Sequence, residues 1–131
     1  MSKMGKVKGA SGEREALKWF MVRFPELGDL TRNLEQTRNG GADCLTIDGI
    51  ALEVKRQEAL AIESWWKQTT RQAVVSKRLP VLMYRQNRRQ WFFCIPASLL
   101  ITGSWGYLTL TSAEFTNWFK QWLGEGNEHN A

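Results

Sequence analysis

One stretch of the chain, from Gly41 to Lys55, holds residues whose types and spacing suit hydrolytic chemistry. Glu53 and Lys55 are two residues apart, so on a β-strand both project from one face while Val54 points to the other. Asp43 precedes them, and neighbouring carboxylates repel each other unless a proton or a metal ion is present. Oxygen ligands favour Mg²⁺ or Mn²⁺. With a lysine that positions water or steadies phosphate charge, such a site suits phosphodiester hydrolysis.

The position of Asp43 depends on the register of a predicted hairpin whose turn is Asp48-Gly49. A two-residue turn sets Asp43 opposite Val54, whereas a three-residue loop with a left-handed Gly49 sets it opposite Glu53. We favour the second register because it places the apolar residues of both strands on one face. Paired Cβ atoms are then about 5 Å apart, and both carboxylates can share one cation. Acid-x-Lys on a solvated strand face, with Asp43 as a turn residue, is the alternative.

The elements that must position these residues follow from hydrophobic periodicity and from turn and capping signals. Helices are predicted at 11–24, 64–77 and 112–123, and strands at 30–36, 42–47, 50–56, 80–84, 90–95 and 107–110. Ser11 is the predicted N-cap of the first helix, and Thr111 with Glu114 has the spacing of a capping box. The order α-β-β-β-α-β-β-(β)-α indicates an α/β fold, or α+β in stricter vocabularies, with a mixed sheet flanked by helices.

Length and composition indicate one globular domain, since the 131 residues are 43% apolar and 24% charged. We expect a flexible basic arm at 1–10, the domain at 11–123 and a disordered tail at 124–131. The longest apolar run, 91–101, contains Pro96 and is too short to cross a bilayer. No hydrophobic region follows the N-terminal lysines, as a signal peptide would require. A cytoplasmic protein without a membrane partner is therefore expected.

Histidine and cysteine are scarce: His129 is the only histidine, and Cys44 and Cys94 are the only cysteines. One histidine near the end of the chain argues against His-based nucleophile triads, HNH-type nucleases and His-ligated zinc. Two cysteines make neither a disulfide framework nor a zinc cluster, and both are interpreted as buried apolar residues. Catalysis must therefore depend on carboxylates, lysine or a hard metal ion.

Charge and aromatic residues point to an anionic partner. Eighteen Lys and Arg against thirteen Asp and Glu give a net charge of +5. Between 64 and 113 there are seven Lys and Arg and no Asp or Glu, which is typical of a face that follows phosphates, with solubility as the alternative. Trp65 or Trp66 could stack on bases. Trp118 and Trp122, one helical turn apart, indicate a core stripe or a dimer interface.

The order of these motifs resembles the PD-(D/E)XK nuclease superfamily, in which Asp and Glu-x-Lys lie in a hairpin after an N-terminal helix. The sequence is most similar to archaeal-type Holliday junction resolvases and their phage-borne relatives, which begin with a Lys-Gly-rich arm and a Glu-Arg-Glu helix. Lys8-Gly9 and Glu13-Arg14-Glu15 match these features, and 79–84 and 90–95 match the later strands. The resemblance covers roughly 6–96. Ala42 replaces the family's proline, and 97–131 has no counterpart.

The resemblance also implies roles for particular residues. The implied catalytic and metal-binding residues are Glu13, Asp43, Glu53 and the backbone carbonyl of Val54, with Lys55 acting at the scissile phosphate. Glu15 is the competing helix carboxylate. The candidate DNA contacts are Lys8, Arg14, Arg38, Asn39, Arg56, Lys67 and Arg71. Gln57, and Gln68 or Gln72 from the second helix, are possible accessory residues that orient water or phosphate, or else ordinary solvated side chains.

The leading hypothesis is therefore a Mg²⁺-dependent DNA endonuclease, most specifically a Holliday junction resolvase, with Mn²⁺ as a substitute metal. A junction needs two symmetric cuts, so a homodimer is expected, with the aromatic C-terminal helix as the candidate interface. A nicking or restriction-like nuclease on linear, flap or single-stranded DNA is one alternative. A non-catalytic nucleic-acid-binding module on the same fold is the other.

Overall fold

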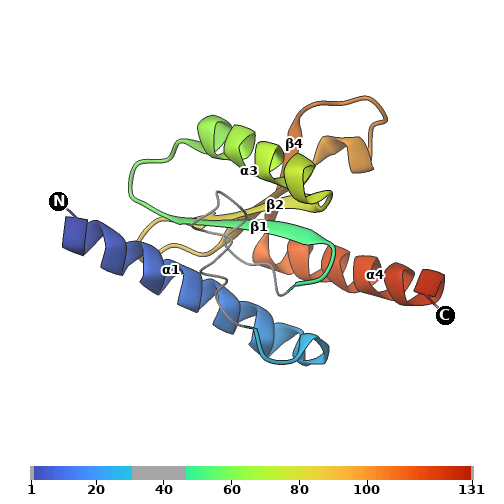
Figure 1. Cartoon of the computed structure of the whole chain (residues 1–131), viewed down its shortest axis with the longest axis horizontal. Coiled ribbons are helices and arrows are strands. Elements are labelled where there is room, and N and C mark those ends of the chain that lie inside the picture. The colour runs from blue at the N-terminus through green and yellow to red at the C-terminus, as the bar shows by residue number, and fades with distance from the viewer. Residues whose placement is uncertain (1, 31–46, 131) are drawn as a thin grey trace.

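The computed structural model describes residues 2–30 and 47–130, and side chains at 12–30 and 47–125. Among these residues, a long helix and a short 3₁₀ helix precede the sheet, one helix lies between its first two strands, and another follows its last strand (Figure 1). In chain order they are α1 (Ser2–Arg23), the 3₁₀ helix η1 (Pro25–Leu27), β1 (Ile50–Arg56), α3 (Ile62–Ser76), β2 (Leu79–Arg85), β3 (Phe92–Pro96), the 3₁₀ helix η2 (Ala97–Leu99), β4 (Tyr107–Thr111) and α4 (Ser112–Asn130).

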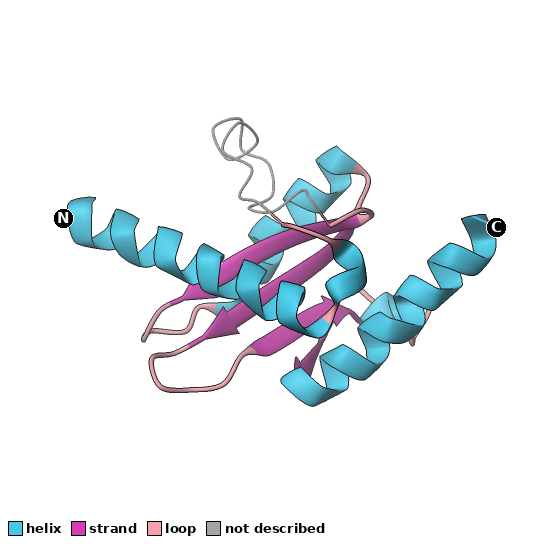
Figure 2. Ribbon diagram, turned by 90° about the horizontal axis from the view of Figure 1, so that it is seen from below, coloured by secondary structure: helices cyan, strands magenta, loops and turns pink. Residues whose placement is uncertain are grey.

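The four strands form one mixed sheet in the order β1-β2-β3-β4. β1 and β2 are parallel and are connected through α3, while β2–β3 and β3–β4 are antiparallel. Helices lie on both faces of this sheet (Figure 2). The expected α/β, or α+β, architecture of a mixed sheet flanked by helices is therefore confirmed. Of the predicted strands, 30–36 and 42–47 fall on 31–46, outside the described residues, apart from one terminal residue each.

The main core fills the space between the sheet and the pair α1 and α4. Leu52 of β1 and Val81 of β2 are fully buried there against Phe20 of α1 and Phe119 of α4. Burying such side chains contributes about 1.5–3 kcal/mol each. The apolar side chains of this face therefore stabilise the packing of α1 and α4 on the sheet.

The opposite face of the sheet is covered by α3. Trp65 and Trp66 are buried there, at 6% and 5% exposed, and pack with Leu82, Tyr84 and Cys94. The expectation that Cys94 is a buried apolar residue is confirmed, whereas Cys44 lies outside the described residues. Both tryptophans form part of the core, so the suggested base stacking by either one is wrong.

The last helix starts at the predicted capping box. The Thr111 backbone N–H donates to Glu114 Oε1 at 2.8 Å, and the Glu114 N–H donates to Thr111 Oγ1 at 3.2 Å. The aromatic stripe that follows is core, since Phe115 and Phe119 are fully buried and Trp118 packs on the same cluster. This helix was the candidate dimer interface, but its aromatic face packs against the main core of the same chain.

Two helices are longer than expected. α1 begins at Ser2 instead of near Ser11, and α4 continues to Asn130 instead of ending at Leu123. The capping and glycine signals were misleading because Lys, Met, Ala and Glu around them are good helix formers, and an interior Gly costs only about 1 kcal/mol. No helix in the described parts of the chain is long and apolar enough to cross a membrane.

Candidate active site

β1 carries the Glu-x-Lys pair on the face that α3 covers. Ala51, two residues before the glutamate, packs against Ala73 of α3, whereas Leu52 packs on the opposite, main core. Glu53 is only 3% exposed, and Lys55 Nζ lies 3.4 Å from Glu53 Oε1. The prediction that these two side chains share one strand face is confirmed.

The burial of Glu53 is itself informative. A carboxylate withdrawn from water costs several kcal/mol, and a cation at ion-pair distance offsets part of that cost. The Lys55 side chain is only 20% exposed, so its ammonium is held beside the carboxylate instead of moving freely in solvent. Val54, between them, turns to the other face and packs on the main core. Buried, paired acid and base groups of this kind concentrate at functional sites.

The turn before β1 has the predicted left-handed glycine. Gly49 has φ +80°, and the Ile50 N–H donates to the Ile47 carbonyl at 3.3 Å. The Gly49 backbone lies against α4, where an added Cβ would meet Trp122 Cη2 at 2.9 Å. Asp43 lies outside the described residues, so its pairing opposite Glu53 stays a prediction.

Whether the site suits a metal ion can be judged from its donors. Among residues 2–30 and 47–130, no three His, Cys, Asp or Glu side chains form a group that could hold a metal. Asp43 lies outside these residues. Glu13 and Glu53 each bury one carboxylate oxygen, Oε2, and carboxylate oxygens are the donors that Mg²⁺ prefers. The donor chemistry therefore fits Mg²⁺, with Asp43 as the further ligand to be tested.

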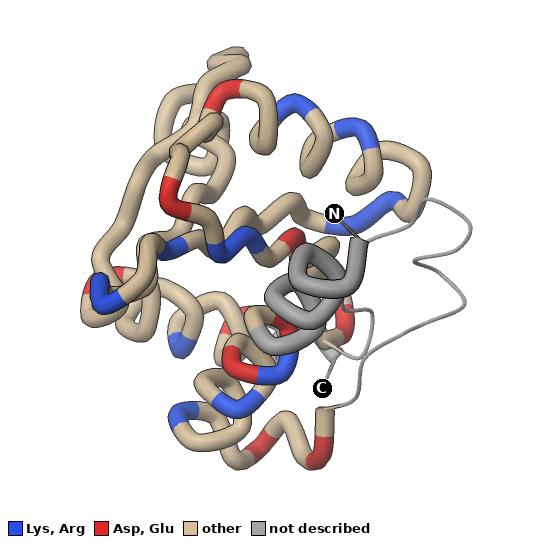
Figure 3. The backbone as a smooth tube through the Cα atoms, turned by 90° about the vertical axis from the view of Figure 1, so that its left-hand side faces the viewer, with Lys and Arg blue, Asp and Glu red and all other residues tan. Residues whose placement is uncertain are grey.

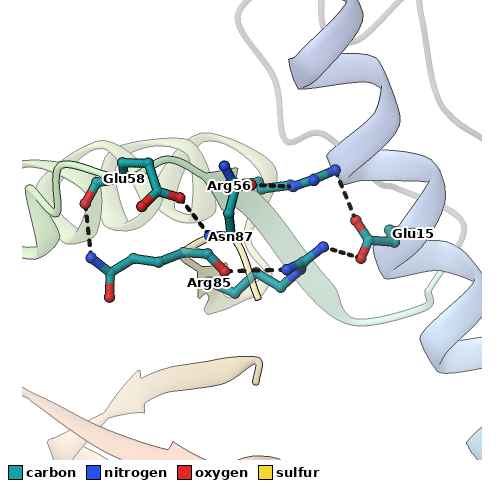
Figure 4. Close-up of polar contacts among 6 residues, drawn as sticks. Glu15, Arg56, Glu58, Arg85 and Asn87 are labelled. Atoms are coloured by element: carbon teal, nitrogen blue, oxygen red, sulfur yellow. Dashed lines mark hydrogen bonds and ion pairs between the residues drawn. The ribbon is translucent and has the colours of Figure 1, made fainter. Parts of the chain in front are cut away.

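Helix α1 presents the two competing carboxylates in different surroundings. α1 lies close to β1 at Gly12, where an added Cβ would be 3.2 Å from Arg56 Cβ. Glu13 follows directly and is half-buried. Glu15 is instead bound by two arginines: its Oε2 lies 3.3 Å from Arg56 Nη1, and its Oε1 accepts from Arg85 Nη2. Glu15 thus joins α1 to the ends of both parallel strands (Figure 4).

The Glu15 ion pairs belong to a larger polar network that the sequence analysis missed. Arg56 Nε donates to Asn87 Oδ1 at 3.2 Å, and the Asn87 N–H donates to Glu58 Oε1 at 2.6 Å. Arg85 is one of the seven cations of 64–113, a segment without Asp or Glu, but Glu15 of α1 forms an ion pair with it. No sequence signal reveals these pairs, because their members are 29 to 70 positions apart.

The predicted DNA contacts are dispersed over the molecule. Arg14 is exposed on α1, and Lys67 and Arg71 are exposed on the outer side of α3. Figure 3 shows Lys and Arg spread over the helices and strand ends instead of collected on one element. Arg56 is engaged by Glu15 and Asn87. The Lys8 side chain and all of Arg38 and Asn39 lie outside the part of the chain that is described.

The candidate accessory glutamines differ in burial. Gln57 is exposed at the end of β1, where its N–H donates to the Arg85 carbonyl at 3.2 Å. Gln72 is half-buried on α3, next to Ala73, which contacts β1. Its Oε1 atom is buried and has no hydrogen-bond donor among the described residues. Gln72 therefore has an unsatisfied, buried amide oxygen on the helix above the Glu53 face, whereas the Gln57 side chain is exposed to solvent.

Three titratable side chains on this side of the sheet, Tyr84, Cys94 and Tyr107, have raised pKa values and are neutral near pH 7. Burial raises the pKa of Cys94 to about 11. The pKa of Tyr107 is raised to about 12, mainly by burial and to a smaller extent by its hydrogen bond to Glu63. Burial also raises the pKa of Tyr84. A thiolate or phenolate nucleophile is therefore not available here near neutral pH, in agreement with a site based on carboxylate and lysine.

Comparison with known proteins places these observations in a family. A solved structure, the Holliday junction resolvase Hjc of the archaeal hyperthermophile Archaeoglobus fulgidus, is similar at 19% identity and a TM-score of 0.49, over 84% of this chain and 96% of that one. No curated protein matches the chain. The model of a family described as phage putative PDDEXK endonuclease matches residues 4–105, which include both Glu13 and the Glu53–Lys55 pair. The chain therefore belongs to this family of phage PD-(D/E)XK endonucleases.

Proposed function

We propose that this nuclease is a Mg²⁺-dependent endodeoxyribonuclease that cuts branched DNA, most specifically a Holliday junction, as a homodimer in the cytoplasm. The observation that carries the proposal is the buried Glu53 carboxylate with Lys55 at 3.4 Å on one face of β1. The choice of branched DNA rests on the sequence resemblance of the Lys-Gly arm and the Glu-Arg-Glu helix. Mn²⁺ would substitute for Mg²⁺ because both prefer oxygen ligands.

In this proposal Glu53, Asp43, Glu13 and the Val54 carbonyl hold the metal ion. The bound ion would polarise the phosphate and lower the pKa of a coordinated water. Glu53 supplies a carboxylate that is already desolvated, so it needs no reorganisation when the ion binds. Lys55 steadies negative charge on the scissile phosphate, and its pairing with Glu53 keeps the ammonium in place before DNA arrives.

Glu13, and not Glu15, is proposed as the helix carboxylate. Glu15 already binds two arginines, and moving it to a metal would leave Arg85, 13% exposed, without its anion. Glu13 is half-buried next to Gly12, where α1 lies close to Arg56 of β1. Arg56 then positions α1 through Glu15, in addition to its expected contact with the DNA backbone.

DNA binding is proposed to use the exposed cations around this site. Arg14 neighbours Glu13 on the same helix and is free to reach a phosphate. Lys8, Arg38 and Asn39 would extend the contact along the backbone, and Lys67 and Arg71 would contribute from α3. Gln72 is proposed to orient a water or phosphate oxygen with its amide, and Gln57 is the weaker candidate of the two glutamines.

A cleavage assay tests the proposal. A labelled four-way junction and its linear arms are incubated with Mg²⁺, Mn²⁺ or EDTA and with wild type, Glu53→Gln or Lys55→Met. Lys120→Met, which changes an exposed lysine on α4, is the matched control. We expect paired symmetric nicks on the junction alone, unchanged in the control and reduced at least 100-fold in both site variants.

The outcomes separate the alternatives. Metal-dependent cutting of linear arms, flaps or single strands would keep the nuclease site but replace the junction by another substrate. Tight DNA binding without cleavage in either metal would refute the enzyme and leave a nucleic-acid-binding module. Cleavage that survives both site variants would refute the roles given to Glu53 and Lys55.

A further inference from the structure

The turn between β2 and β3, at 86–90, carries two exposed arginines at the end of the sheet where β1 and β2 finish together. Arg56 at the end of β1 is paired with Arg85 at the end of β2, so the turn begins beside the end of the strand that carries the candidate site. Arg88 and Arg89 are exposed in this turn, and within 12–30 and 47–125 no acidic side chain forms an ion pair with either one. Arg56 and Arg85, by contrast, are both bound by Glu15. The turn therefore holds two cations that no described acid neutralises.

Hydrogen bonds fix the shape of this turn. Within it, the Arg89 N–H donates to the Gln86 carbonyl at 3.2 Å. The segment after β1 contributes Glu58, whose Oε1 accepts from the Asn87 N–H at 2.6 Å (Figure 4) and whose carbonyl accepts from Gln86 Nε2 at 2.8 Å. Arg56 Nε donates to Asn87 Oδ1 at 3.2 Å. A turn held in this way loses little conformational freedom when its side chains bind a ligand.

Arg88 has a backbone conformation that a side chain disfavours. Its φ is +62°, and it is the third residue of the turn closed by Arg89 and Gln86, a position where positive φ favours Gly or Asn. Lys77 also has positive φ, but it ends α3, where a left-handed residue is common. Strained residues such as Arg88 persist where the surrounding structure holds them, and they concentrate at ligand clamps and active sites. The strain therefore points to a use for the Arg88 side chain.

We propose that this turn is a preformed clamp for the DNA backbone beside the scissile phosphate. Arg88 and Arg89 each bind a phosphate of one strand, and Glu58 is a positioning residue that holds the turn. A guanidinium matches phosphate oxygens with two parallel hydrogen bonds. The inference deepens the proposed function and rests on it, because the phosphates belong to the DNA that the Glu53–Lys55 site cuts.

The strand register limits which phosphates the turn can reach. Lys55 is paired with Tyr84, and Arg88 follows Tyr84 by four residues, which span at most about 14 Å. Neighbouring strands are about 4.8 Å apart, so the Arg88 backbone lies within about 15 Å of that of Lys55. A DNA strand advances about 3.4 Å along the axis per nucleotide. The clamped phosphates are therefore expected within roughly five nucleotides of the cut.

The composition of the turn favours DNA over a protein partner. All five residues at 86–90 are polar or basic, so the turn has no apolar side chain for the core of a protein interface. Phosphate contacts of this kind fix the position of DNA without reading its sequence. The turn thus suits a nuclease that recognises the shape of its substrate.

DNA binding in EDTA, where cleavage cannot occur, tests the clamp. Fluorescence anisotropy measures the affinity of the double variant Arg88→Gln/Arg89→Gln for a labelled four-way junction over a series of salt concentrations. We expect the dissociation constant to rise about tenfold near 100 mM salt, and the slope of log K against log salt to fall by about 1.8, for two lost phosphate contacts. Arg23→Gln/Lys120→Gln is the matched control, because it removes two exposed cations on other elements. It should bind within about twofold of wild type.

Phosphates that are neutralised one at a time as methylphosphonates locate the clamp. Wild type should lose affinity at phosphates within roughly five nucleotides of the cut that is mapped in Mg²⁺. The double variant should be insensitive at one or two of these phosphates and as sensitive as wild type at the others. An unchanged pattern in the double variant would overturn the proposal.

Two substitutions of Glu58 test its positioning role by the sign of the effect. Removing an acid near DNA ordinarily strengthens binding. Glu58→Gln, which keeps an oxygen to accept from the Asn87 N–H, should bind as tightly as wild type or more tightly. Glu58→Ala loses that oxygen and should bind at least about threefold more weakly. Equal binding by the two variants would refute the positioning role.

Arg88→Gly separates the use of the side chain from the stability of the fold. It removes the strain at φ +62°, so its urea midpoint should rise while its DNA affinity falls about threefold. A lower midpoint would contradict the strain. Circular dichroism checks that every variant folds.

The outcomes distinguish the clamp from the proposed function. Wild type that does not bind the junction, or a double variant that binds and keeps the salt slope of wild type, would overturn the clamp. If that double variant still cuts DNA, the nuclease stands without the clamp. Weaker binding by the double variant, with no cleavage by wild type in Mg²⁺ or Mn²⁺, would refute the nuclease and leave the turn as a DNA contact.

Discussion

The different roles proposed for Glu13 and Glu15 can be tested directly: Glu13 is proposed to bind the metal ion, and Glu15 to join α1 to the ends of β1 and β2. Glu15→Gln removes the charge shared by Arg56 and Arg85 while keeping the size of the side chain. Arg85 is 13% and Arg56 25% exposed, so both would lose an anion in a partly desolvated position. Exposed ion pairs contribute about 0.2–1 kcal/mol, and hydrogen bonds to charged groups about 1.5–3. Glu15 is 36% exposed, which screens the pairs, so we expect a loss of about 1–2 kcal/mol.

Urea unfolding followed by circular dichroism measures this loss as a change in the midpoint at constant m-value. Glu26→Gln, at an exposed position of η1, is the matched control and should change stability by less than about 0.5 kcal/mol. A double-mutant cycle with Arg85→Met isolates the pair, since the coupling disappears once the arginine is gone.

The cleavage assay gives the second half of the test. Glu15→Gln should cut DNA within about fivefold of wild type below its unfolding midpoint, whereas Glu13→Gln should lose cleavage at least about 100-fold under conditions in which circular dichroism shows it folded. The reasoning is refuted if Glu15→Gln leaves stability unchanged. An exchanged pattern, with Glu15→Gln inactive and Glu13→Gln active, would transfer the metal-binding role to Glu15.

Three further predictions concern the core and the turn that position the site. Gly49→Ala should lower the free energy of unfolding in urea by more than about 2 kcal/mol, because φ is +80° and the new Cβ would meet Trp122 at 2.9 Å. Gly103→Ala is the control: its φ is +84° but its Cβ would meet nothing, so it should lose only the energy of the backbone strain. Equal losses in the two variants would contradict the clash with Trp122. Phe115 is fully buried, and its ring stacks on that of Phe93 in β3 with 4.0 Å between the ring centroids. Phe115→Ala should lower the free energy of unfolding by about 3–5 kcal/mol in the same assay, and a loss below about 1 kcal/mol would contradict its role in the core. Cys94, with its pKa raised to about 11, should react slowly with iodoacetamide near pH 8 in the folded chain and faster as the pH rises toward 11. Peptide mapping measures the labelling, and rapid labelling of Cys94 at about pH 8 would contradict its burial.

Local features of the site were predictable from the sequence because they depend on short spacings. Period-two alternation along 50–56 is enough to place Glu53 and Lys55 on one strand face, with Val54 on the other. Gly49 adopts the left-handed conformation that its turn requires. The capping box before α4 also involves residues only three positions apart. Each prediction needed only backbone geometry over a few residues.

Tertiary structure alone decided which distant residues meet. Spacing cannot show that Glu15 binds Arg85, 70 positions away, or that the aromatic face of α4 closes the main core. An amphipathic helix has the same sequence pattern whether its apolar face meets its own sheet or another molecule. The parallel register of β1 and β2 places Arg56 beside Arg85, and this is where Glu15 of α1 binds both arginines. The burial of Trp65 and Trp66 and the 96% exposure of Trp105 are decided in the same way, because the three tryptophans differ in the tertiary contacts that surround them.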